Sequence, residues 1–382
     1  MDSLTQVVLG AAVGEAVLGK KIGNRAMVWG AVAGTIPDLD VYLRYFTDPM
    51  TATEMHRGFS HSIIFSVLMA AILGYCVWKQ ARISLIAFLT ILAVYPILRG
   101  SSLTFIIISL GLLGLLGFLI WRRGESELKA TQWEWSKLFY WTLVTHPLLD
   151  AHTTWGTQLF WPFEYRVAYQ NIFVVDPLYT LPFLVFTLIA LFMKRTNPKR
   201  AKFNRIGLIV SSSYMVLSIV LKAVTFNSFE KQLEIDKISY VEMDTRPAPL
   251  NTFLWNAQVE TKTGYRMAYY SIFDSQPIQF SEEFPKNHHL LEPYKDQKAV
   301  KQLIKISQGW YMVREEDGKL YYIDLRFGQL GFDPDESDFI WKFELVPDEN
   351  GQLEIERLQP DLQKAGDIRT IMKSLWQRML GN

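Results

Sequence analysis

The sequence predicts an α-helical polytopic membrane bundle followed by a soluble C-terminal α+β domain built on an antiparallel sheet. Two observations support this fold class. Nearly all the long apolar runs fall in residues 1–226, and the pattern after them alternates with a period of two, as in strands. Charge divides at the same place, with 20 Lys and Arg against 12 Asp and Glu in residues 1–226 and 19 against 26 in residues 227–382. We therefore predict a basic membrane domain at 1–226 and an acidic soluble domain at 227–382.

Composition limits the class of protein further. The 382 residues carry a formal net charge of +1, which argues against a disordered chain and against direct electrostatic binding of nucleic acid. The single cysteine, Cys76, excludes an intrachain disulfide and a cysteine-based zinc site. It lies in an apolar run, so we interpret it as a small buried hydrophobe. The N-terminus lacks the basic segment of a secretory signal, so the first apolar stretch is expected to remain as a helix.

Eight apolar runs form the predicted membrane domain. They span residues 4–18, 26–37, 62–78, 83–98, 103–121, 138–149, 177–193 and 206–221. A helix that crosses a bilayer needs about 20 residues. The runs that meet or approach this length are 62–78, 103–121, 177–193 and 206–221, and 83–98 is predicted to pair with 62–78 as a hairpin. We expect the remaining runs to be tilted, re-entrant or buried among the longer helices.

Basic residues predict the orientation of the bundle. Four connecting segments have an excess of lysine and arginine: Lys20-Lys21-Arg25, Lys79-Arg82, Arg122-Arg123 and 194–205. Short loops of this kind lie in the cytoplasm. If every apolar run crosses the bilayer, all four segments fall on that side. The segments outside the cytoplasm are then 38–61, 99–102, 150–176 and everything after residue 225.

Turn signals predict the strands of the soluble domain. Three pairs of alternating segments flank a short turn: 251–259 with 265–272, 309–314 with 319–325, and 339–346 with 352–357. The turns are Thr263-Gly264, Asp317-Gly318 and Asn350-Gly351, and Asp-Gly and Asn-Gly are the strongest short-range hairpin signals. Helices are predicted at 290–306 and 361–379.

The first cluster of polar residues follows a short apolar helix. Asp38 and Asp40 stand after Pro37, which helps to end that helix. Two carboxylates in such a loop can offer oxygen ligands to one or two cations. The alternative is a solvated helix C-terminus, although an Asp there opposes the helix dipole.

The second cluster is the segment His56-Arg57-Gly58-Phe59-Ser60-His61-Ser62, directly before the run 62–78. On one helix His56 and His61 would point about 140° apart, so they converge only if His56 lies in a loop. Ser60 is predicted to cap a helix that begins near His61. Arg57 could hold a phosphate or carboxylate through its planar guanidinium. The alternative is a pair of interfacial histidines beside a snorkelling arginine.

The third cluster is the segment 146–154. His146 and Asp150 are four residues apart, which places them on one helical face where both can ligate one ion. Pro147 predicts that the helix begins or kinks there. His152 joins the set only if the helix ends after Asp150. The alternative is a helix-terminal His–Asp pair with no ion.

All three clusters lie on the same predicted membrane face. Ionisable residues at membrane depth are costly, so they point to function by default. Imidazole and carboxylate bind Zn²⁺, Mn²⁺ or Fe²⁺, and this mixture does not select among them. Such ions polarise a phosphoryl or acyl oxygen and lower the pKa of a bound water. That chemistry is hydrolysis.

These motifs resemble those of the YdjM family. The resemblance rests on Met1–Gln6, Gly34–Asp40, His56–Ser62 and His146–Asp150, and it covers roughly residues 1–225. The segment from Ala248 onward is similar to the soluble C-terminal domain of longer members. The family comprises bacterial inner-membrane-associated proteins that are catalogued as metal-dependent hydrolases from such motifs. The resemblance therefore implies a multi-pass protein of the bacterial inner membrane.

A looser likeness exists to the helical zinc-dependent phospholipase C and nuclease group. Those enzymes also order an Asp, a His and then a His-x-x-x-Asp, as Asp38, His56 or His61, and His146 with Asp150 do here. A second His-x-x-x-Glu/Asp element is not evident, so we expect one or two ions rather than three.

Several other residues are predicted to have structural rather than catalytic roles. His288-His289 lies between prolines and is predicted to be a surface loop, and Asp176 is predicted to cap the helix that begins at Pro177. Five tryptophans that flank apolar runs are predicted interface anchors: Trp133, Trp135, Trp141, Trp155 and Trp161. Three glycines in one apolar run are predicted to mark helix packing: Gly111, Gly114 and Gly117.

We therefore predict a membrane-embedded metal-dependent hydrolase. Its predicted metal ligands are Asp38, Asp40, His56, His61, His146 and Asp150. Asp40, Arg57 and His61 are the predicted catalytic residues, with Arg57 as the anchor for an anionic substrate. The predicted cofactor is a divalent metal, with zinc first and manganese or iron as alternatives. The predicted partners are membrane lipids and a small-molecule or lipid substrate, such as a lipid-linked phosphodiester or ester. The partner of the C-terminal domain is unknown.

Two other hypotheses remain open at this point. One is a non-enzymatic membrane sensor whose C-terminal domain recruits a partner, and the other is an ion-coupled transporter that relays protons through its His and Asp residues. The hydrolase hypothesis requires the six predicted ligands to converge within a few Å of a common point.

Overall fold

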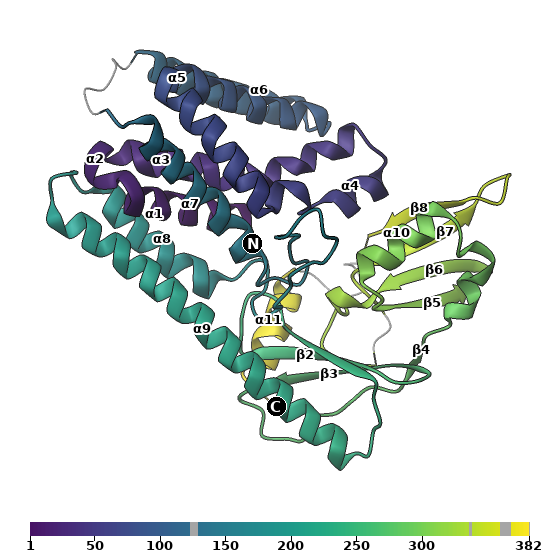
Figure 1. The fold of residues 1–382 in the computed structure, drawn as a ribbon. Coiled ribbons are helices and arrows are strands. Elements are labelled where there is room, and N and C mark those ends of the chain that lie inside the picture. The colour runs from purple at the N-terminus through teal and green to yellow at the C-terminus, as the bar shows by residue number, and fades with distance from the viewer. Residues whose placement is uncertain (123–128, 336–337, 360–367, 382) are drawn as a thin grey trace. The chain divides into compact units, whose positions relative to one another are not determined.

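The chain divides into two compact units in the computed structural model, which describes residues 1–122, 129–335, 338–359 and 368–381 (Figure 1). The N-terminal unit comprises Met1–Ala151, Gly156–Val167 and Tyr179–Ser212. The C-terminal unit comprises His152–Trp155, Ala168–Leu178 and Ser213–Asn382. Arg123 of the third basic segment and residues 361–367 of the last predicted helix lie outside the described residues.

Helices account for nearly all the apolar runs of the sequence. In chain order they are α1 (Ser3–Gly14), the π-helical turn η1 (Glu15–Gly19), α2 (Lys20–Ile22), α3 (Asn24–Thr35), the 3₁₀ helix η2 (Pro37–Tyr45), α4 (Pro49–Met55), the 3₁₀ turn η3 (Phe59–His61), α5 (Ile63–Leu98), α6 (Leu103–Arg122), α7 (Gln132–Asp150), α8 (Pro177–Phe192) and α9 (Pro198–Ile235). The domain boundary predicted at residue 226 falls within α9.

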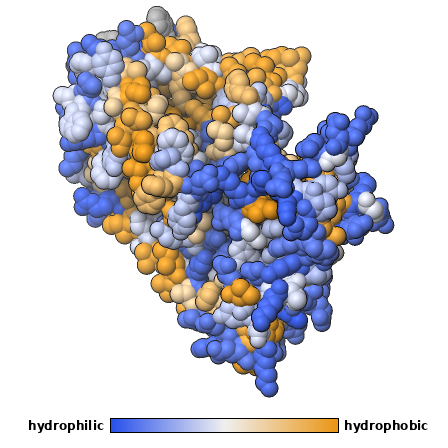
Figure 2. Space-filling view, turned by 45° about the vertical axis from the view of Figure 1, so that its right-hand side comes forward, coloured by the Kyte–Doolittle hydropathy of each residue, from blue (hydrophilic) through white to orange (hydrophobic). Residues whose placement is uncertain are grey.

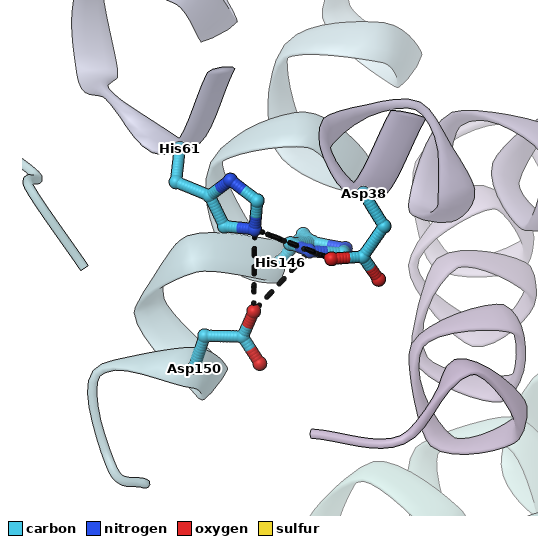
Figure 3. Close-up of side chains that lie close together, drawn as sticks. All are labelled: Asp38, His61, His146 and Asp150. Carbon is cyan, nitrogen blue, oxygen red and sulfur yellow. Dashed lines mark hydrogen bonds and ion pairs between the residues drawn. The ribbon is translucent and has the colours of Figure 1, made fainter. Parts of the chain in front are cut away.

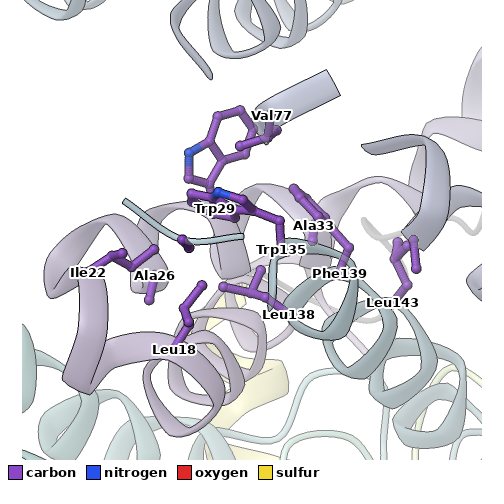
Figure 4. Packing of buried hydrophobic residues seen from close by; sticks show 12 residues of the cluster. Leu18, Ile22, Ala26, Trp29, Ala33, Val77, Trp135, Leu138, Phe139 and Leu143 are labelled. Carbon is purple, nitrogen blue, oxygen red and sulfur yellow. The ribbon is translucent and has the colours of Figure 1, made fainter. Parts of the chain in front are cut away.

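The core of the N-terminal unit lies between α1, α3, α5 and α7 (Figure 4). Trp29 of α3 packs edge-on against Trp135 and Phe139 of α7, with ring centroids 6.2 and 5.9 Å apart. Burial of such side chains stabilises the unit by about 1.5–3 kcal/mol each. The runs 4–18 and 26–37 are thus buried among other helices, which is one of the alternatives predicted for them.

Glycines allow α1 and α3 to approach until their backbones touch. A Cβ added at Gly10 would lie 2.2 Å from the carbonyl oxygen of Gly30, and one added at Gly14 would lie 2.2 Å from that of Ala26. A Cβ at Gly34 would lie 2.5 Å from the carbonyl oxygen of Gln6. Glycines four residues apart on each helix therefore form the contact, as in close-packed membrane helices.

Helix α5 bends sharply at Gln80, where the backbone leaves helical geometry at φ −147° and ψ 68°. A straight helix of 36 residues would be about 54 Å long. Instead, its second arm and the turn η3 just before its first arm both bond to η2: the Tyr42 hydroxyl donates to the carbonyl oxygen of Ile91 at 2.5 Å, and Ser60 donates to Asp40 at 3.1 Å. The chain therefore turns back where the sequence predicts the turn of a hairpin.

Apolar side chains also cover much of the helical surface (Figure 2). By length and composition, α5 and α9 could each cross a membrane. Cys76 is exposed on α5, so the prediction that it is buried was wrong; it lies on the outer face of a helix whose inner face packs on α7. The predicted packing role of Gly111, Gly114 and Gly117 was also wrong, since no described atom lies within 4 Å of a Cβ built at any of them.

Two basic turns meet at one end of the bundle. Arg195, after α8, donates to the carbonyl oxygen of Lys20 at 3.0 Å. Arg200 of α9 pairs with Glu15 of η1 through both carboxylate oxygens at 2.7 and 2.6 Å, and both side chains are buried. Two of the basic segments therefore lie on the same side of the bundle, as the sequence predicts.

The C-terminal unit contains two four-stranded antiparallel sheets, with neighbouring strands in chain order. The first consists of β1 (Glu242–Pro247), β2 (Leu254–Glu260), β3 (Gly264–Ser271) and β4 (Phe284–Pro285), and the second of β5 (Tyr311–Glu316), β6 (Lys319–Asp324), β7 (Lys342–Pro347) and β8 (Leu353–Leu358). The other elements are the 3₁₀ helices η4 (His288–Tyr294) and η5 (Leu325–Phe327) and the helices α10 (Lys298–Ser307) and α11 (Ile368–Met379).

All three predicted hairpins are confirmed, as β2–β3, β5–β6 and β7–β8. The prediction of one sheet was wrong, because β1 and β4 complete a separate sheet around the first hairpin. The predicted helix 290–306 begins only at Lys298, because Pro293 interrupts it. His288 is not in a surface loop: it lies in η4, and its ring stacks on Tyr311 with centroids 4.0 Å apart.

The five tryptophans predicted as interface anchors have different environments. Trp135 is buried in the core, so this prediction was wrong for it; it lies on the inward face of α7. Trp155 packs within the C-terminal unit against Phe327 and Trp341. The other three are exposed: Trp133, Trp141 and Trp161.

Candidate metal centre

Four side chains from distant parts of the sequence converge inside the N-terminal unit (Figure 3). Asp38 comes from the first turn of η2, His61 from η3, and His146 and Asp150 from the last turns of α7. One ligand atom from each lies within 4.8 Å of all the others. His61, His146 and Asp150 are buried, whereas 25% of the Asp38 side chain is exposed.

The spacing of these atoms matches a metal coordination sphere. Nε2 of each histidine lies 3.4 Å from Asp38 Oδ1 and 3.4 Å from Asp150 Oδ2, and the two Nε2 atoms are 3.2 Å apart. Ligands about 2.1 Å from a zinc ion at the centre of a regular tetrahedron would be about 3.4 Å apart. Five of the six distances agree with this value, and the two carboxylate oxygens form the sixth, within 4.8 Å.

The outer hydrogen bond of His146 fixes its tautomer. Its Nδ1 lies 2.7 Å from the carbonyl oxygen of Gly34, at the end of α3. A carbonyl oxygen only accepts, so Nδ1 carries the proton and donates it. In the neutral ring, Nε2 then presents a lone pair to the other three side chains. Metal-bound histidines are oriented in this way by a partner on their second nitrogen.

A short hydrogen-bonded chain orients His61 in the same manner. Asp40 Oδ2 accepts from the Ser60 hydroxyl at 3.1 Å, so the Ser60 oxygen is available to accept from His61 Nδ1 at 2.9 Å. His61 Nε2 then also presents a lone pair to the centre. Both carboxylates are acceptors as well when ionised.

The four convergent atoms are therefore acceptors facing one another. Without a metal ion or a proton between them, these lone pairs and charges would repel, and burial would strengthen the repulsion. Two imidazoles and two carboxylates are a donor set that suits zinc, iron or manganese. The residues present thus fit a divalent metal ion.

Asp150 is held by groups on both sides. Its Oδ1 accepts from Gln6 Nε2 at 2.9 Å and from the amino group of Met1, so the start of α1 also lies at the site. Arg57 Nε lies 3.3 Å from Oδ2. These cationic and donor groups balance the charge of a buried carboxylate, which would otherwise be costly.

Arg57 itself has a strained backbone. Its φ is 56°, a region that non-glycine residues rarely adopt. Its N–H donates to Asp40 Oδ2 at 2.8 Å, and its carbonyl oxygen accepts from the N–H of Gln158 at 3.0 Å. Strain of this kind persists where surrounding contacts enforce it, and it concentrates at functional sites.

Of the six predicted ligands, four meet and two lie beside them. Asp40 accepts from Ser60, from the Arg57 backbone and from His56 Nδ1 at 2.9 Å, so it orients its neighbours and is not one of the four convergent groups. His56 lies on the far side of Asp40 and is likewise not one of the four. His152 bonds to Asn171 within the C-terminal unit.

Two capping predictions have opposite outcomes. Asp176 caps α8 as predicted, since its Oδ1 accepts from the N–H of Leu178 at 2.9 Å. The prediction that Ser60 caps a helix was wrong. Ser62 caps α5 by accepting from the N–H of Phe65 at 3.0 Å, because η3 delays the start of that helix. Ser60 is thereby left to join Asp40 and His61.

Burial and the neighbouring histidines act in opposite directions on the pKa values of the two η2 carboxyl groups, Asp38 and Asp40. Burial raises the pKa of Asp38, but without a metal ion the charge and N–H groups of the protonated His146 and His61 rings outweigh it and hold the pKa well below its ordinary value. Burial also raises the pKa of Asp40, and the contacts with His56, His61 and the Arg57 N–H again lower it overall. Both groups are therefore carboxylates at neutral pH.

Replacing Asp40 with asparagine is expected to weaken metal binding by about 10–100-fold, the usual cost of losing an outer partner of a ligand. An asparagine accepts at only one end of its amide and carries no charge, so the hydrogen bonds that both Asp40 oxygens now accept are weakened. Competition with a chromophoric chelator measures the affinity. Asp48→Asn is the matched control, because Asp48 caps α4 through Thr51 and asparagine caps equally well. Equal affinities for the two variants would show that Asp40 has no orienting role.

Sequence reasoning missed three groups of this site: Gln6, the Gly34 carbonyl and the Ser60 hydroxyl as a link. A glutamine within the apolar run 4–18 was a usable signal, since an amide in a buried helix needs a partner. Nothing in the sequence marks the Gly34 carbonyl as the partner of His146, because every residue has the same backbone carbonyl group.

The fold and the site together define a class of protein: a helical unit with apolar helices on its surface and a buried cluster of two histidines and two aspartates. The YdjM inner membrane protein family matches residues 1–98 and 100–227. The chain therefore belongs to the YdjM family of inner membrane proteins. No curated protein and no solved structure matches it.

Proposed function

We propose that the protein is a metal-dependent hydrolase whose centre is held by Asp38, His61, His146 and Asp150. The observation that carries the proposal is the convergence of four acceptor atoms, three from buried side chains and one from the partly exposed Asp38, at coordination spacing. A divalent ion there supplies a Lewis acid that activates water and polarises an ester or phosphoryl oxygen. Zinc is the leading choice for this donor set, with manganese or iron as alternatives.

The remaining residues of the proposed site have positioning roles. Asp40 orients His61 through Ser60, and the Gly34 carbonyl orients His146. Arg57 is buried and holds Asp150, and the fork of its guanidinium is suited to an anionic group of a substrate. Substrate would approach from the side of Asp38, the most exposed of the four.

We place the site on the extracytoplasmic face of a multi-pass bundle. Helix α7 begins at the basic end, where Glu134 pairs with Lys21 at 2.7 Å, and it ends with the ligand Asp150. These ends are about 24 Å apart along the helix, close to the thickness of a bilayer core of about 30 Å. Because basic turns stay in the cytoplasm, the ligands fall near the opposite face.

We also propose that the C-terminal domain lies outside the cytoplasm. Helix α9 starts at the basic end, where Arg200 pairs with Glu15. Its 38 residues extend about 57 Å, more than enough to cross the bilayer once. The strands that follow would then emerge outside the cytoplasm.

Elemental analysis and hydrolysis assays test the proposed function. Protein purified in nanodiscs is expected to contain about one zinc, manganese or iron ion per chain. It is expected to hydrolyse bis(p-nitrophenyl) phosphate or p-nitrophenyl acetate, to lose this activity on chelation, and to regain it with zinc or manganese. Magnesium serves as the control, because it prefers oxygen-only sites and should not restore activity. Absence of a bound transition metal, or activity that chelation leaves unchanged, would contradict the proposal.

A further inference from the structure

Exposed aromatic side chains crowd the segment 156–167 beside the metal centre. We call the four residues Phe160, Trp161, Phe163 and Tyr165 the aromatic loop. Their side chains are 55%, 37%, 72% and 70% exposed. Each aromatic ring can bury some 150–250 Å² of surface, so leaving four of them in water is unfavourable. Their exposure therefore indicates that an apolar or interfacial environment surrounds them.

Backbone hydrogen bonds attach the aromatic loop to the segment that supplies His61. The N–H of Gln158 donates to the carbonyl oxygen of Arg57, and the N–H of Ile63 donates to that of Leu159, both at 3.0 Å. Arg166 closes the other side by donating to the carbonyl oxygen of His56 at 2.9 Å. The aromatic loop and the site therefore form one local structure, and whatever surrounds the loop lies next to the site.

The aromatic loop continues into the apolar surface of α5. The Trp161 ring packs on Phe59 with centroids 4.8 Å apart, and Phe59 packs on Phe65 of the first turn of α5 at 5.4 Å. Exposed aliphatic side chains of α5 lie on either side of Phe65 in the sequence: Ile64, Val67, Leu68 and Ile72. Helix α5 is one of the two helices able to cross a membrane. Its lipid-facing surface would thus begin where the aromatic loop ends.

We propose that the aromatic loop lies in the bilayer interface and presents membrane lipid to the metal centre. Tryptophan and tyrosine favour the headgroup level, where one end of the side chain is apolar and the other is wet. The substrate class is then a membrane lipid with a phosphodiester or ester bond near its headgroup. This inference rests on the proposed function of the site.

Depth-dependent quenching tests the position of the aromatic loop without relying on activity. In the full chain with Cys76→Ser, Phe163→Cys carries an environment-sensitive fluorophore, and Lys262→Cys in the exposed β2–β3 turn is the control. In nanodiscs, a doxyl group near the lipid headgroup is expected to quench the label at 163 strongly and iodide to quench it weakly. The label at 262 should show the reverse. Equal iodide quenching at both positions would overturn the proposal. That result is the one expected of a loop that binds a soluble partner.

A comparison of two substrates tests whether the substrate is a membrane lipid. The probes are dioleoylphosphatidylglycerol in vesicles and its soluble headgroup analogue glycerophosphoglycerol. The double variant Phe160→Ser/Phe163→Ser is expected to raise KM at least tenfold for the lipid and to leave the analogue unchanged, whereas Phe273→Ser, an exposed aromatic of the C-terminal unit, changes neither. Equal effects on both substrates would overturn the assignment of the substrate. If wild-type protein with bound metal cleaves the p-nitrophenyl substrates but neither of these probes, the assignment of the substrate is overturned. If it cleaves none of them, the proposed function fails, while the quenching result still decides where the loop lies.

Discussion

Replacing Gly30 with valine is expected to force α1 and α3 apart and to destabilise the N-terminal unit severely. A Cβ at Gly30 would lie 2.1 Å from the carbonyl oxygen of Gly10 and 3.0 Å from the Cα of Gly14. Both obstacles are backbone atoms, so no side chain can rotate away. Overpacking in a core commonly costs about 1–3 kcal/mol and occasionally more. We expect the upper end of this range or beyond, because two whole helices must shift.

The same change should also disrupt the site. Gly34, whose carbonyl oxygen holds His146, lies in the last turn of α3, and that helix leads directly to Asp38. Thermal unfolding followed by tryptophan fluorescence, with metal content measured in parallel, checks both effects. Gly111→Val is the matched control, since no described atom lies within 4 Å of that position. Valine has a higher helix propensity than glycine, so a loss at Gly30 alone identifies packing as the cause. Equal melting temperatures for both variants would contradict the proposed contact.

The glycine contact shows what sequence spacing could have predicted. Gly10 and Gly14, like Gly30 and Gly34, are four residues apart, which keeps each pair on one helical face. The three glycines of α6 are three residues apart, so each step turns by about 60° away from a common face. The four-residue pairs were visible in the sequence, and the usual rule for close-packed helices would have selected them.

The choice of ligands could be predicted only in part. The four-residue spacing of His146 and Asp150 on one helix was sufficient to pair them, and the structure bears this out. Asp38 and Asp40 are chemically equivalent in the sequence. They differ because Pro37 starts a 3₁₀ helix, in which residues two apart point about 120° apart. Asp38 consequently points to the histidines of the cluster, and Asp40 points to Ser60 and His56.

The outer contacts depend on the tertiary fold and leave no local pattern. His61 is oriented through Ser60, which stands next to it, but the carboxylate that completes the chain comes from Asp40, 21 residues earlier. The apolar pattern predicts where helices lie, yet it does not give the rotation of η2 and η3 about their axes. That rotation decides which polar side chains face the centre.

Replacing His146 with alanine is expected to abolish stoichiometric metal binding and to reduce hydrolysis to background. The variant removes one of the four groups that converge among the described residues, so the loss of affinity should exceed the 10–100-fold typical of an outer partner. His152→Ala is the matched control: it removes a second histidine of the same sequence motif, but one that bonds to Asn171 away from the cluster. We expect this control to retain wild-type metal content.

Metal-dependent stability separates a metal ligand from a residue that merely packs in the bundle. An ion that binds only the folded state at 100 times its Kd stabilises that state by about 2.7 kcal/mol. Zinc should therefore raise the melting temperature of wild-type protein and of His152→Ala, and it should leave that of His146→Ala unchanged. Without metal, His146→Ala loses its bond to Gly34 and its contacts with His61 and the two carboxylates, so its melting temperature should lie below that of metal-free wild type. The response to zinc is therefore the deciding measurement. If zinc stabilised neither protein, the four side chains would be polar contacts of the bundle and the hydrolase proposal would lose its support.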